Sequence, residues 1–286
     1  MKFSNFQCGR FRFDLNKKRM PLVMGILNVT PDSFSDGGRF QALESALSHA
    51  ESMIEAGVDI IDIGAESTRP GAASLSIDEE LRRLLPVVFA LRDCGKPLSI
   101  DTRNPVVMKE VLAAGVDMIN DVNGFRHVDA LTTVKGSECG LCIMHMLNDP
   151  QTMQIDPMYG NVVSEVTDFL QNRVDCFEQA GVARGRLCID PGFGFGKTLA
   201  HNLALLKSIA KISDSTGLPI LAGVSRKSMI GALTGRSVED RMAGSLAGAL
   251  AAMINGARIL RVHDVAETID ALKVFVVATS SCDPVQ

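Results

Sequence analysis

Eight short apolar runs, each ending in or followed by polar residues, constrain the fold of this chain most strongly. They lie at 25–28, 61–64, 98–101, 118–121, 142–145, 188–190, 219–222 and 260–263. Stretches of helical periodicity separate them, so a strand and a helix alternate at intervals of roughly 25–40 residues. This pattern predicts an α/β protein with a (β/α)8 TIM barrel, in which the carboxyl ends of eight parallel strands meet at one site.

Helix signals between the runs support that arrangement. In 42–56, apolar residues recur on one face before Gly57, and Ser76 with Glu79 forms a capping box ahead of the second helix. Gly136 interrupts the fourth helical stretch, 128–139, so we expect that helix to be short. A doubly wound sheet also alternates strands and helices, but no dinucleotide fingerprint follows the first run.

The first residues predict a β-hairpin ahead of the barrel. Within 3–15, four phenylalanines flank a turn at Cys8–Gly9, and we expect this hairpin to cover the barrel floor. The length of 286 residues fits one barrel of about 250 residues plus a short extension. We therefore predict a single domain over 1–286, with 1–20 as the hairpin extension, because no linker rich in Pro, Gly or Ser divides it.

Composition restricts the partners and the compartment. The net charge of −4 argues against binding of nucleic acid or of an anionic membrane, so an anionic substrate requires a local basic cluster. No run approaches the roughly 18 apolar residues of a membrane span, and 1–20 lacks the apolar core of a signal peptide. Seven cysteines without framework spacing predict a cytoplasmic location. Cys139 and Cys142 form C-x-x-C, but in a strand that offset points the two thiols to opposite faces.

Polar residues at the strand ends predict the binding site. Asp101, Asn120 and Asp190 end the third, fourth and sixth runs. Each residue type is also a common helix N-cap, but three at one barrel mouth favour a ligand site. Two carboxylates and an amide suit a ligand rich in N–H donors, such as an aminopyrimidinone ring. Lys227, after the seventh run, is either a Schiff-base lysine or a cation beside a ring carbonyl.

A basic pair ends the eighth run. Arg261 and His263 alternate along the strand and so share one face, which predicts an anion site, since phosphate near strands seven and eight is a recurring feature of this fold. Asn28 ends the first strand, which neighbours the eighth in a closed barrel. His145 ends the fifth run and is left without an assigned role.

Three loops complete the expected site. The segment 190–198 is rich in glycine but is no P-loop, because Pro191 stands where the first glycine is required. It suits either close backbone approach to a flat ligand or mobility. The segments 30–38 and 66–72 are long for βα loops and expose Phe34 and Arg69, so we expect mobile lids there.

Taken jointly, these motifs resemble the dihydropteroate synthase family of folate biosynthesis. The resemblance covers 20–275 and rests on Met24–Gly38, Glu66–Gly71, Ser99–Thr102, Ile119–Asp121, Asp190–Lys197, Gly223–Lys227 and Arg261–Asp264. It implies a transferase that joins 6-hydroxymethyl-7,8-dihydropterin pyrophosphate to p-aminobenzoate by an SN1-like route and is inhibited by sulfonamides. A homodimer formed through the small-residue helix 243–257 and a Mg²⁺ cofactor are expected as well.

The resemblance also implies residue roles. Asp101, Lys227, Arg261 and His263 are the expected catalytic residues, and Asn28 is the expected Mg²⁺ ligand. Arg261, His263 and Asn28 would hold the pyrophosphate. The expected substrate-binding residues are Thr68, Arg69, Pro70, Asp101, Asn120, Met144, Asp190, Phe193, Gly223, Ser225, Lys227, Arg261 and His263.

Three other functions share parts of this pattern. A pterin-dependent methyltransferase domain also places Asp and Asn at a pterin, but it does not require the basic pair of the eighth run or the Thr68–Pro70 segment. A Schiff-base aldolase would use Lys227 covalently. A silent pterin-binding paralogue would keep the core of the site without turnover, and intact lid loops argue against it.

Overall fold

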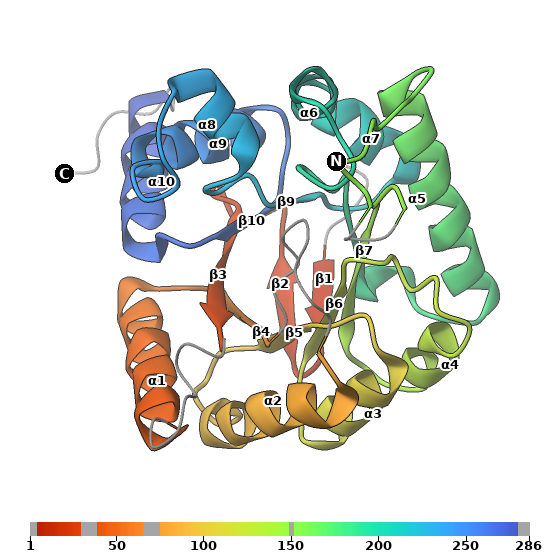
Figure 1. Cartoon of the computed structure of the whole chain (residues 1–286), viewed down its shortest axis with the longest axis vertical. Coiled ribbons are helices and arrows are strands. Elements are labelled where there is room, and N and C mark those ends of the chain that lie inside the picture. The colour runs from red at the N-terminus through yellow and green to blue at the C-terminus, as the bar shows by residue number, and fades with distance from the viewer. Residues whose placement is uncertain (1–4, 30–38, 66–74, 149–151, 280–286) are drawn as a thin grey trace.

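The computed structural model describes residues 5–29, 39–65, 75–148 and 152–279. A parallel sheet of eight strands forms its centre, and helices surround that sheet (Figure 1). The strands of the sheet are β3 (Leu22–Asn28), β4 (Ile60–Gly64), β5 (Leu98–Asp101), β6 (Met118–Asp121), β7 (Gly140–Met144), β8 (Leu187–Asp190), β9 (Leu221–Ala222) and β10 (Ile259–Val262).

The eight strands close into a barrel. Their order is β8-β7-β6-β5-β4-β3-β10-β9, and a parallel bridge between Ile189 in β8 and Ile220 ahead of β9 joins the two ends. The expected TIM barrel is therefore confirmed, and each of the eight apolar runs supplies one strand. The seventh strand is shorter than its run, because Pro219 has no backbone N–H to contribute to the ladder.

The helices follow the expected alternation with two differences. They are α1 (Arg39–Ala56), α2 (Ile77–Leu91), α3 (Pro105–Ala113), α4 (Ala130–Lys135), α5 (Val162–Gln179), α6 (Leu199–Lys207), α7 (Ile209–Thr216), α8 (Ser228–Thr234), α9 (Met242–Ile254) and α10 (Val265–Thr279), with a 3₁₀ turn, η2 (Arg184–Arg186), before β8. The units that follow β8 and β9 each hold two helices instead of one. As predicted, Ser76 caps α2 by accepting the N–H of Glu79, and α4 is short.

Side-chain alternation along the strands separates two cores. Ile61 and Ile63 of β4 pack outward against the helices, whereas Ile60 faces the barrel interior. The same alternation points the polar residue at the end of a strand inward when its apolar neighbours point outward. The interior is filled at its lower end by residues such as Met24, Met118 and Cys142, and polar groups occupy the upper end.

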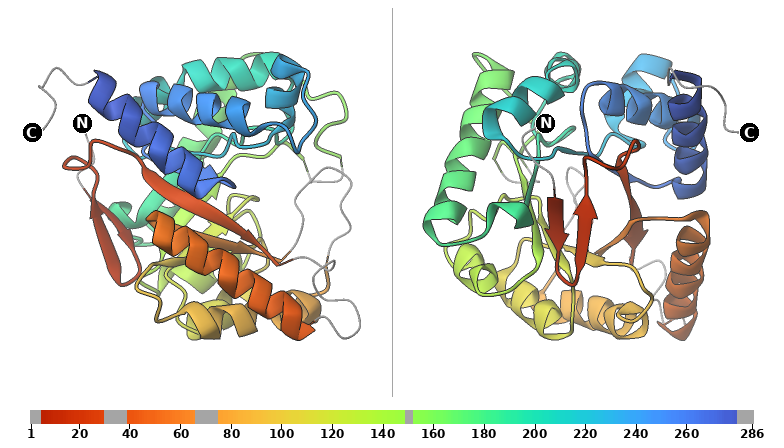
Figure 2. Two further views of the ribbon diagram at one scale, coloured as in Figure 1. Left: turned by 90° about the vertical axis from the view of Figure 1, so that its left-hand side faces the viewer. Right: turned by 180° about the vertical axis from the view of Figure 1, so that it is seen from behind.

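The N-terminal hairpin seals the lower end, as expected. Strands β1 (Asn5–Cys8) and β2 (Phe11–Asp14) pair antiparallel, and Figure 2 shows them at the end of the barrel opposite to the one toward which β3 points. Phe6 and Cys8 belong to the interior core, and Arg10 bonds the buried carboxylate of Asp117 at 2.9 and 3.0 Å. The functional end is therefore the mouth at the carboxyl ends of the strands.

Among the residues that the structure describes, no helix is long and apolar enough to cross a membrane.

Candidate active site

A row of polar residues crosses neighbouring strands at the barrel mouth. The register pairs Asn28 with Gly64, Gly64 with Asp101, and Asp101 with Asn120, so these positions lie side by side. Asp101 and Asn120 are buried and follow outward-facing isoleucines, so both point inward. The side chain of Asn28 is exposed. The strand-end pattern predicts these three residues at one mouth, and the structure brings them together.

Arg261 of β10 reaches across the mouth to two carboxylates. Its Nε donates to Asp62 Oδ2 at 2.6 Å, and its Nη2 donates to Asp101 Oδ2 at 2.8 Å. Burial alone would lower the pKa of Arg261, but Asp62 and Asp101 raise it, so the guanidinium stays charged. The positive charge that predicted an anion site is thus already balanced by carboxylates in this structure.

Asp62 is a site residue that the sequence analysis missed. It is fully buried, and its Oδ2 also accepts the amide N–H of Asn120 at 3.2 Å. A signal existed in the sequence, because a lone carboxylate between Ile61 and Ile63 interrupts an otherwise apolar strand. Since those two isoleucines face outward, Asp62 must face the interior.

Several buried oxygens at the mouth have no donor among the described residues. They are Oδ1 of Asp62, Oδ1 of Asp101 and Oγ of Ser99, which pairs in register with Asp62. Burial raises the pKa of Asp101 to about 7, although Arg261 opposes this shift. Buried acceptors without donors are rare in native proteins. This mouth is therefore suited to a ligand that supplies N–H groups.

Asp190 lies on the other side of the mouth, at the end of β8. Its Oδ1 accepts the backbone N–H of Gly192 at 2.7 Å, and burial raises the pKa of its carboxyl to about 6. Gly192 has a φ of +74°, and a Cβ there would collide with the carbonyl oxygen of His145. Gly192 is therefore required for the close approach of this loop to the backbone of His145, while the expected approach of the loop to a flat ligand stays a prediction. Met144 of β7 is paired in register with Asp190 and is buried beside it.

Lys227 projects into the same space from the loop after β9. Its Nζ lies 4.0 Å from the centre of the Phe195 ring. Burial, and next the charge of Arg261, lower the pKa of Lys227 to about 8, while Asp190 and Asp101 oppose the shift. The cation therefore faces both the strand-end carboxylates and an aromatic face.

Phe193 is a correction to the expected site. Its side chain is buried in the core between barrel and helices, so it does not line the mouth. Phe195, two residues later, packs with Met144 and Met146 and contacts Lys227 instead. The sequence offered no way to choose between them, because a loop with glycine at 192, 194 and 196 has no regular side-chain periodicity.

The loops after β9 and β10 are tied together. Ser225 Oγ lies 3.0 Å from His263 Nδ1 and accepts the backbone N–H of His263 at 3.3 Å. Arg226 forms an ion pair with Asp264. Burial, with the nearby charge of Arg261, lowers the pKa of His263 to about 4, so His263 is a neutral hydrogen-bonding group at neutral pH. Gly223 lies beside Arg261, because a Cβ added at 223 would be at an ordinary contact distance of 3.8 Å from the Arg261 Cβ.

Some expected residues lie outside the described part of the chain. Thr68, Arg69 and Pro70, with Phe34, fall in the segments 30–38 and 66–74. Their expected roles stay predictions. The same holds for the lid movements that were expected of these two loops.

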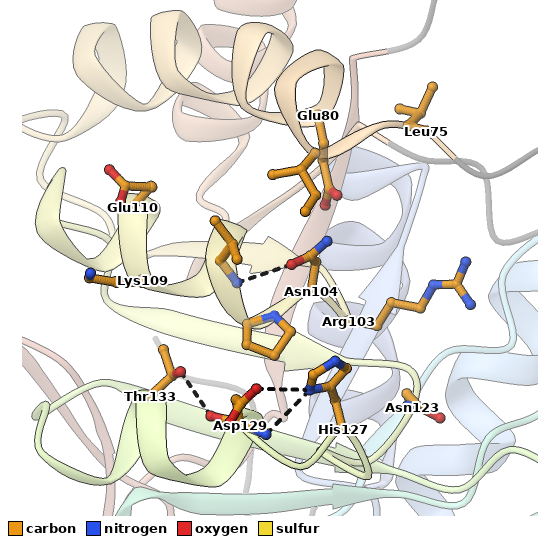
Figure 3. Close-up of a pocket in the computed structure, with 13 residues that line it drawn as sticks. Leu75, Glu80, Arg103, Asn104, Lys109, Glu110, Asn123, His127, Asp129 and Thr133 are labelled. Atoms are coloured by element: carbon orange, nitrogen blue, oxygen red, sulfur yellow. Dashed lines mark hydrogen bonds and ion pairs between the residues drawn. The ribbon is translucent and has the colours of Figure 1, made fainter.

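A pocket lies beside the mouth rather than in it. It has a volume of about 620 Å³ and is lined by the first turns of α2 and α3 and by the segment between β6 and α4 (Figure 3). None of the described residues that line it belongs to the expected site. Its polar groups engage one another locally: Asn104 Oδ1 accepts the N–H of Val106 at 3.0 Å, and His127 Nδ1 accepts that of Asp129 at 3.2 Å. The residues of the expected site therefore lie at the barrel mouth and not in this pocket.

Comparison with known proteins identifies the family. A model of the pterin binding enzymes matches residues 24–263. The dihydropteroate synthase of Neisseria meningitidis serogroup C is 48% identical over 274 residues, which is 94% of this chain and 96% of that protein. This chain belongs to the dihydropteroate synthase family.

Solved structures of dihydropteroate synthases share the whole fold. The Burkholderia cenocepacia enzyme complexed with 7,8-dihydropteroate has a TM-score of 0.86 and 50% identity, with 95% of each chain covered. The Yersinia pestis enzyme with a sulfonamide drug complex has a TM-score of 0.89 and 44% identity, covering 97% of this chain and 100% of that one. The resemblance inferred from the motifs is therefore confirmed.

Proposed function

We propose that this chain joins 6-hydroxymethyl-7,8-dihydropterin pyrophosphate to p-aminobenzoate, forming 7,8-dihydropteroate and pyrophosphate. The observation that carries the proposal is the set of inward carboxylates, Asp101 and Asp190, facing Lys227 across the mouth of a dihydropteroate synthase barrel. An aminopyrimidinone ring presents N–H donors and a carbonyl acceptor along its edge. Asp190 and Asn120 match the donors, and Lys227 matches the carbonyl.

The chemistry follows from the electron-rich dihydropterin ring. The bond between the exocyclic methylene carbon and the pyrophosphate oxygen breaks, and its electron pair leaves with pyrophosphate. The methylene becomes cationic, and the ring delocalises that charge in an SN1-like path. The amine of p-aminobenzoate then forms the new C–N bond and releases a proton to solvent. Asp101 stabilises the developing positive charge, since its carboxylate lies at the mouth and one of its oxygens has no donor.

Arg261 and His263 are proposed to receive the leaving group. For Arg261 this requires sharing its guanidinium with Asp62 and Asp101, which it bonds in this structure. His263 contributes as a neutral N–H donor, because its pKa is lowered to about 4. Both residues therefore favour the release of pyrophosphate through hydrogen bonds, and of the two only Arg261 also contributes a positive charge.

The residues present fit a Mg²⁺ ion held mainly by substrate. The described residues include no cluster of three or more His, Cys, Asp or Glu that could hold a metal. Mg²⁺ commonly takes one or two protein oxygens and completes its shell with water and substrate phosphates. The exposed amide oxygen of Asn28, at the end of β3, is such a ligand. The ion would neutralise negative charge on the departing pyrophosphate.

The p-aminobenzoate pocket is proposed at the side of the mouth formed by Phe195, Ser225 and Lys227. Phe195 supplies an aromatic face, and Ser225 is held in place by His263. Thr68, Arg69 and Pro70 are proposed to complete the pocket. A sulfonamide presents an aniline and an anionic sulfonyl group, so it should compete for this pocket.

We also propose that the chain acts as a homodimer in the cytoplasm. Large apolar side chains are exposed on α8, α9 and α10, namely Leu233, Met242, Ile254, Val274 and Val277. All six cysteines within the described residues are free thiols, which suits a reducing compartment.

Purified protein with Mg²⁺ and both substrates tests the function. We expect pyrophosphate release that depends on both substrates, dihydropteroate detected by mass spectrometry, and sulfonamide inhibition that is competitive with p-aminobenzoate. Folded protein that binds the pterin without releasing pyrophosphate would instead be a silent paralogue. Borohydride trapping of Lys227 with a carbonyl substrate would indicate an aldolase.

A further inference from the structure

Lys197 is a buried cation that the proposed chemistry does not use. Its side chain ends beneath the glycine-rich loop, where only 4% of the residue is exposed. The ammonium donates to Nδ1 of His145 at 3.0 Å, to the carbonyl oxygen of Phe195 at 3.0 Å and to that of His145 at 3.4 Å. All three donors of the ammonium are thus engaged, so the nitrogen has a fixed position.

Other side chains hold the same loop without any charge. Asn202 accepts the N–H of Gly194 at 2.8 Å, Tyr159 OH donates to the carbonyl oxygen of Gly196 at 3.0 Å, and Gln154 donates to that of Gly194 at 2.6 Å. A neutral donor is therefore sufficient to hold loop carbonyls here. A buried ammonium is a costly alternative, which suggests that its charge has a use.

The charge of Lys197 faces Asp190 through Gly192. Asp190 accepts the N–H of Gly192, and a Cβ on Gly192 would lie 3.3 Å from the Lys197 nitrogen. The other groups that face Asp190 are Lys227 from the loop after β9, Arg261 from β10 and the thiol of Cys142 from β7. Lys227 contacts Phe195, and Arg261 bonds Asp62 and Asp101. Lys197 differs from these two cations because its ammonium is bonded to the glycine-rich loop, and the same loop donates the Gly192 N–H to Asp190.

We propose that Lys197 is a positioning residue that keeps Asp190 ionised for pterin binding, and that His145 fixes the Lys197 ammonium for this purpose. The inference rests on the proposed role of Asp190 as an acceptor for pterin N–H groups. An ionised carboxylate accepts at both oxygens, whereas a protonated one loses part of that capacity.

The titration of the three groups is consistent with this role. Burial and, next, the charge of Lys197 lower the pKa of His145 to about 3, so His145 is a neutral acceptor at its Nδ1. Burial lowers the pKa of Lys197 to about 7, although Asp190 opposes the shift. Burial raises the pKa of Asp190 to about 6. The N–H of Gly192, the charge of Lys227 and, next, the charge of Lys197 oppose that rise. The charge of Lys197 therefore opposes the protonation of Asp190, and removing that charge should raise the pKa of Asp190.

Calorimetric binding of 6-hydroxymethylpterin tests the inference, because this probe carries the ring but no titrating pyrophosphate. In the wild type, affinity should fall as pH is lowered through about 6. The midpoint of this fall in affinity should lie about half to one pH unit higher in Lys197→Met. The same shift is expected in Lys197→Gln, which keeps a hydrogen-bond donor for the loop. Asp190→Asn should abolish this pH dependence and so assign it to Asp190.

Tyr159→Phe is the matched control, because it removes a loop contact without removing charge. It should weaken binding by a similar factor at every pH and leave the midpoint unchanged. Wild-type midpoints in both Lys197 variants, or an equal shift in Tyr159→Phe, would overturn the inference while leaving the function intact. A wild type that binds no pterin at any pH would overturn the proposed function and, with it, this inference.

Discussion

At the residue scale, Asp62 is a carboxylate that neutralises the charge of Arg261 at the barrel mouth. It is fully buried and accepts hydrogen bonds from Arg261 and Asn120. Asp62→Ala leaves both donors without this acceptor and should lower the free energy of unfolding by about 3–5 kcal/mol. Urea denaturation measures the change. Asp270→Ala is the control, because Asp270 forms an exposed pair with Lys273 and should matter little; equal losses in the two variants would contradict this account.

Asp101 should impose a pH dependence on catalysis. Burial raises the pKa of its carboxyl to about 7, and a protonated Asp101 cannot stabilise a cation. The value of kcat/KM should therefore fall as pH is lowered through about 7, in the free enzyme that this parameter reports. Asp101→Asn should be slow and should lack this limb, retaining only the decline near pH 6 that Asp190 causes. Persistence of the limb near pH 7 in Asp101→Asn would show that another group causes it.

Residues at strand ends were predictable, whereas contacts between distant loops were not. Asp101, Asn120 and Asp190 follow apolar runs, so the parallel barrel alone brings them together. Asp62 was overlooked because it lies within a run. The pairing of His145 with Lys197 joins two loops 52 residues apart, and no periodicity encodes it. Phe193 was chosen over Phe195 because loop residues lack the alternation that assigns inward and outward faces in a strand.

At the scale of elements, the glycine-rich loop after β8 depends on close backbone contact. Gly192 has a φ of +74°, and a Cβ there would collide with the carbonyl oxygen of His145. Gly192→Ala should therefore displace the loop, lower the melting temperature and abolish pterin binding. Gly235→Ala is a matched control, since Gly235 has a φ of +70° with nothing within 4 Å of an added Cβ. It should cost only the roughly 1–2 kcal/mol of the left-handed conformation. Similar losses of pterin binding in both variants would contradict a steric role for Gly192.

Element boundaries followed the sequence most closely where local signals were strong. Ser76 caps α2, and Gly57 with a φ of +96° follows α1, as the turn residues predicted. The second helix after each of β8 and β9 was not predicted. Ser208, between α6 and α7, makes no side-chain cap, and the stop signal at Gly235, which ends α8 in the left-handed conformation, was not recognised. Strand β9 is held by the closure of the barrel, through its pairing with β10 and the bridge from Ile220, rather than by its own length.

At the scale of the whole molecule, the apolar surface of α9 and α10 predicts how two copies associate. The two helices lie side by side (Figure 1), and Ile254, Val274 and Val277 are 65%, 70% and 64% exposed. Burying a large apolar side chain contributes roughly 1.5–3 kcal/mol, so an interface that covers several of them is favourable. The wild type should therefore be a dimer by light scattering at micromolar concentration.

Charges placed on that surface should separate the dimer. The double variant Val274→Glu with Val277→Glu would place two carboxylates from each copy in the interface, where burying charge is costly. We therefore expect a monomeric mass, and an unchanged far-UV spectrum would show that the fold is intact. Phe89→Glu is the matched control, because Phe89 is an apolar residue of α2 that is 53% exposed and lies on a different helix. That variant should remain a dimer. A monomeric wild type, or dissociation caused equally by the charge at 89, would exclude an interface centred on α9 and α10.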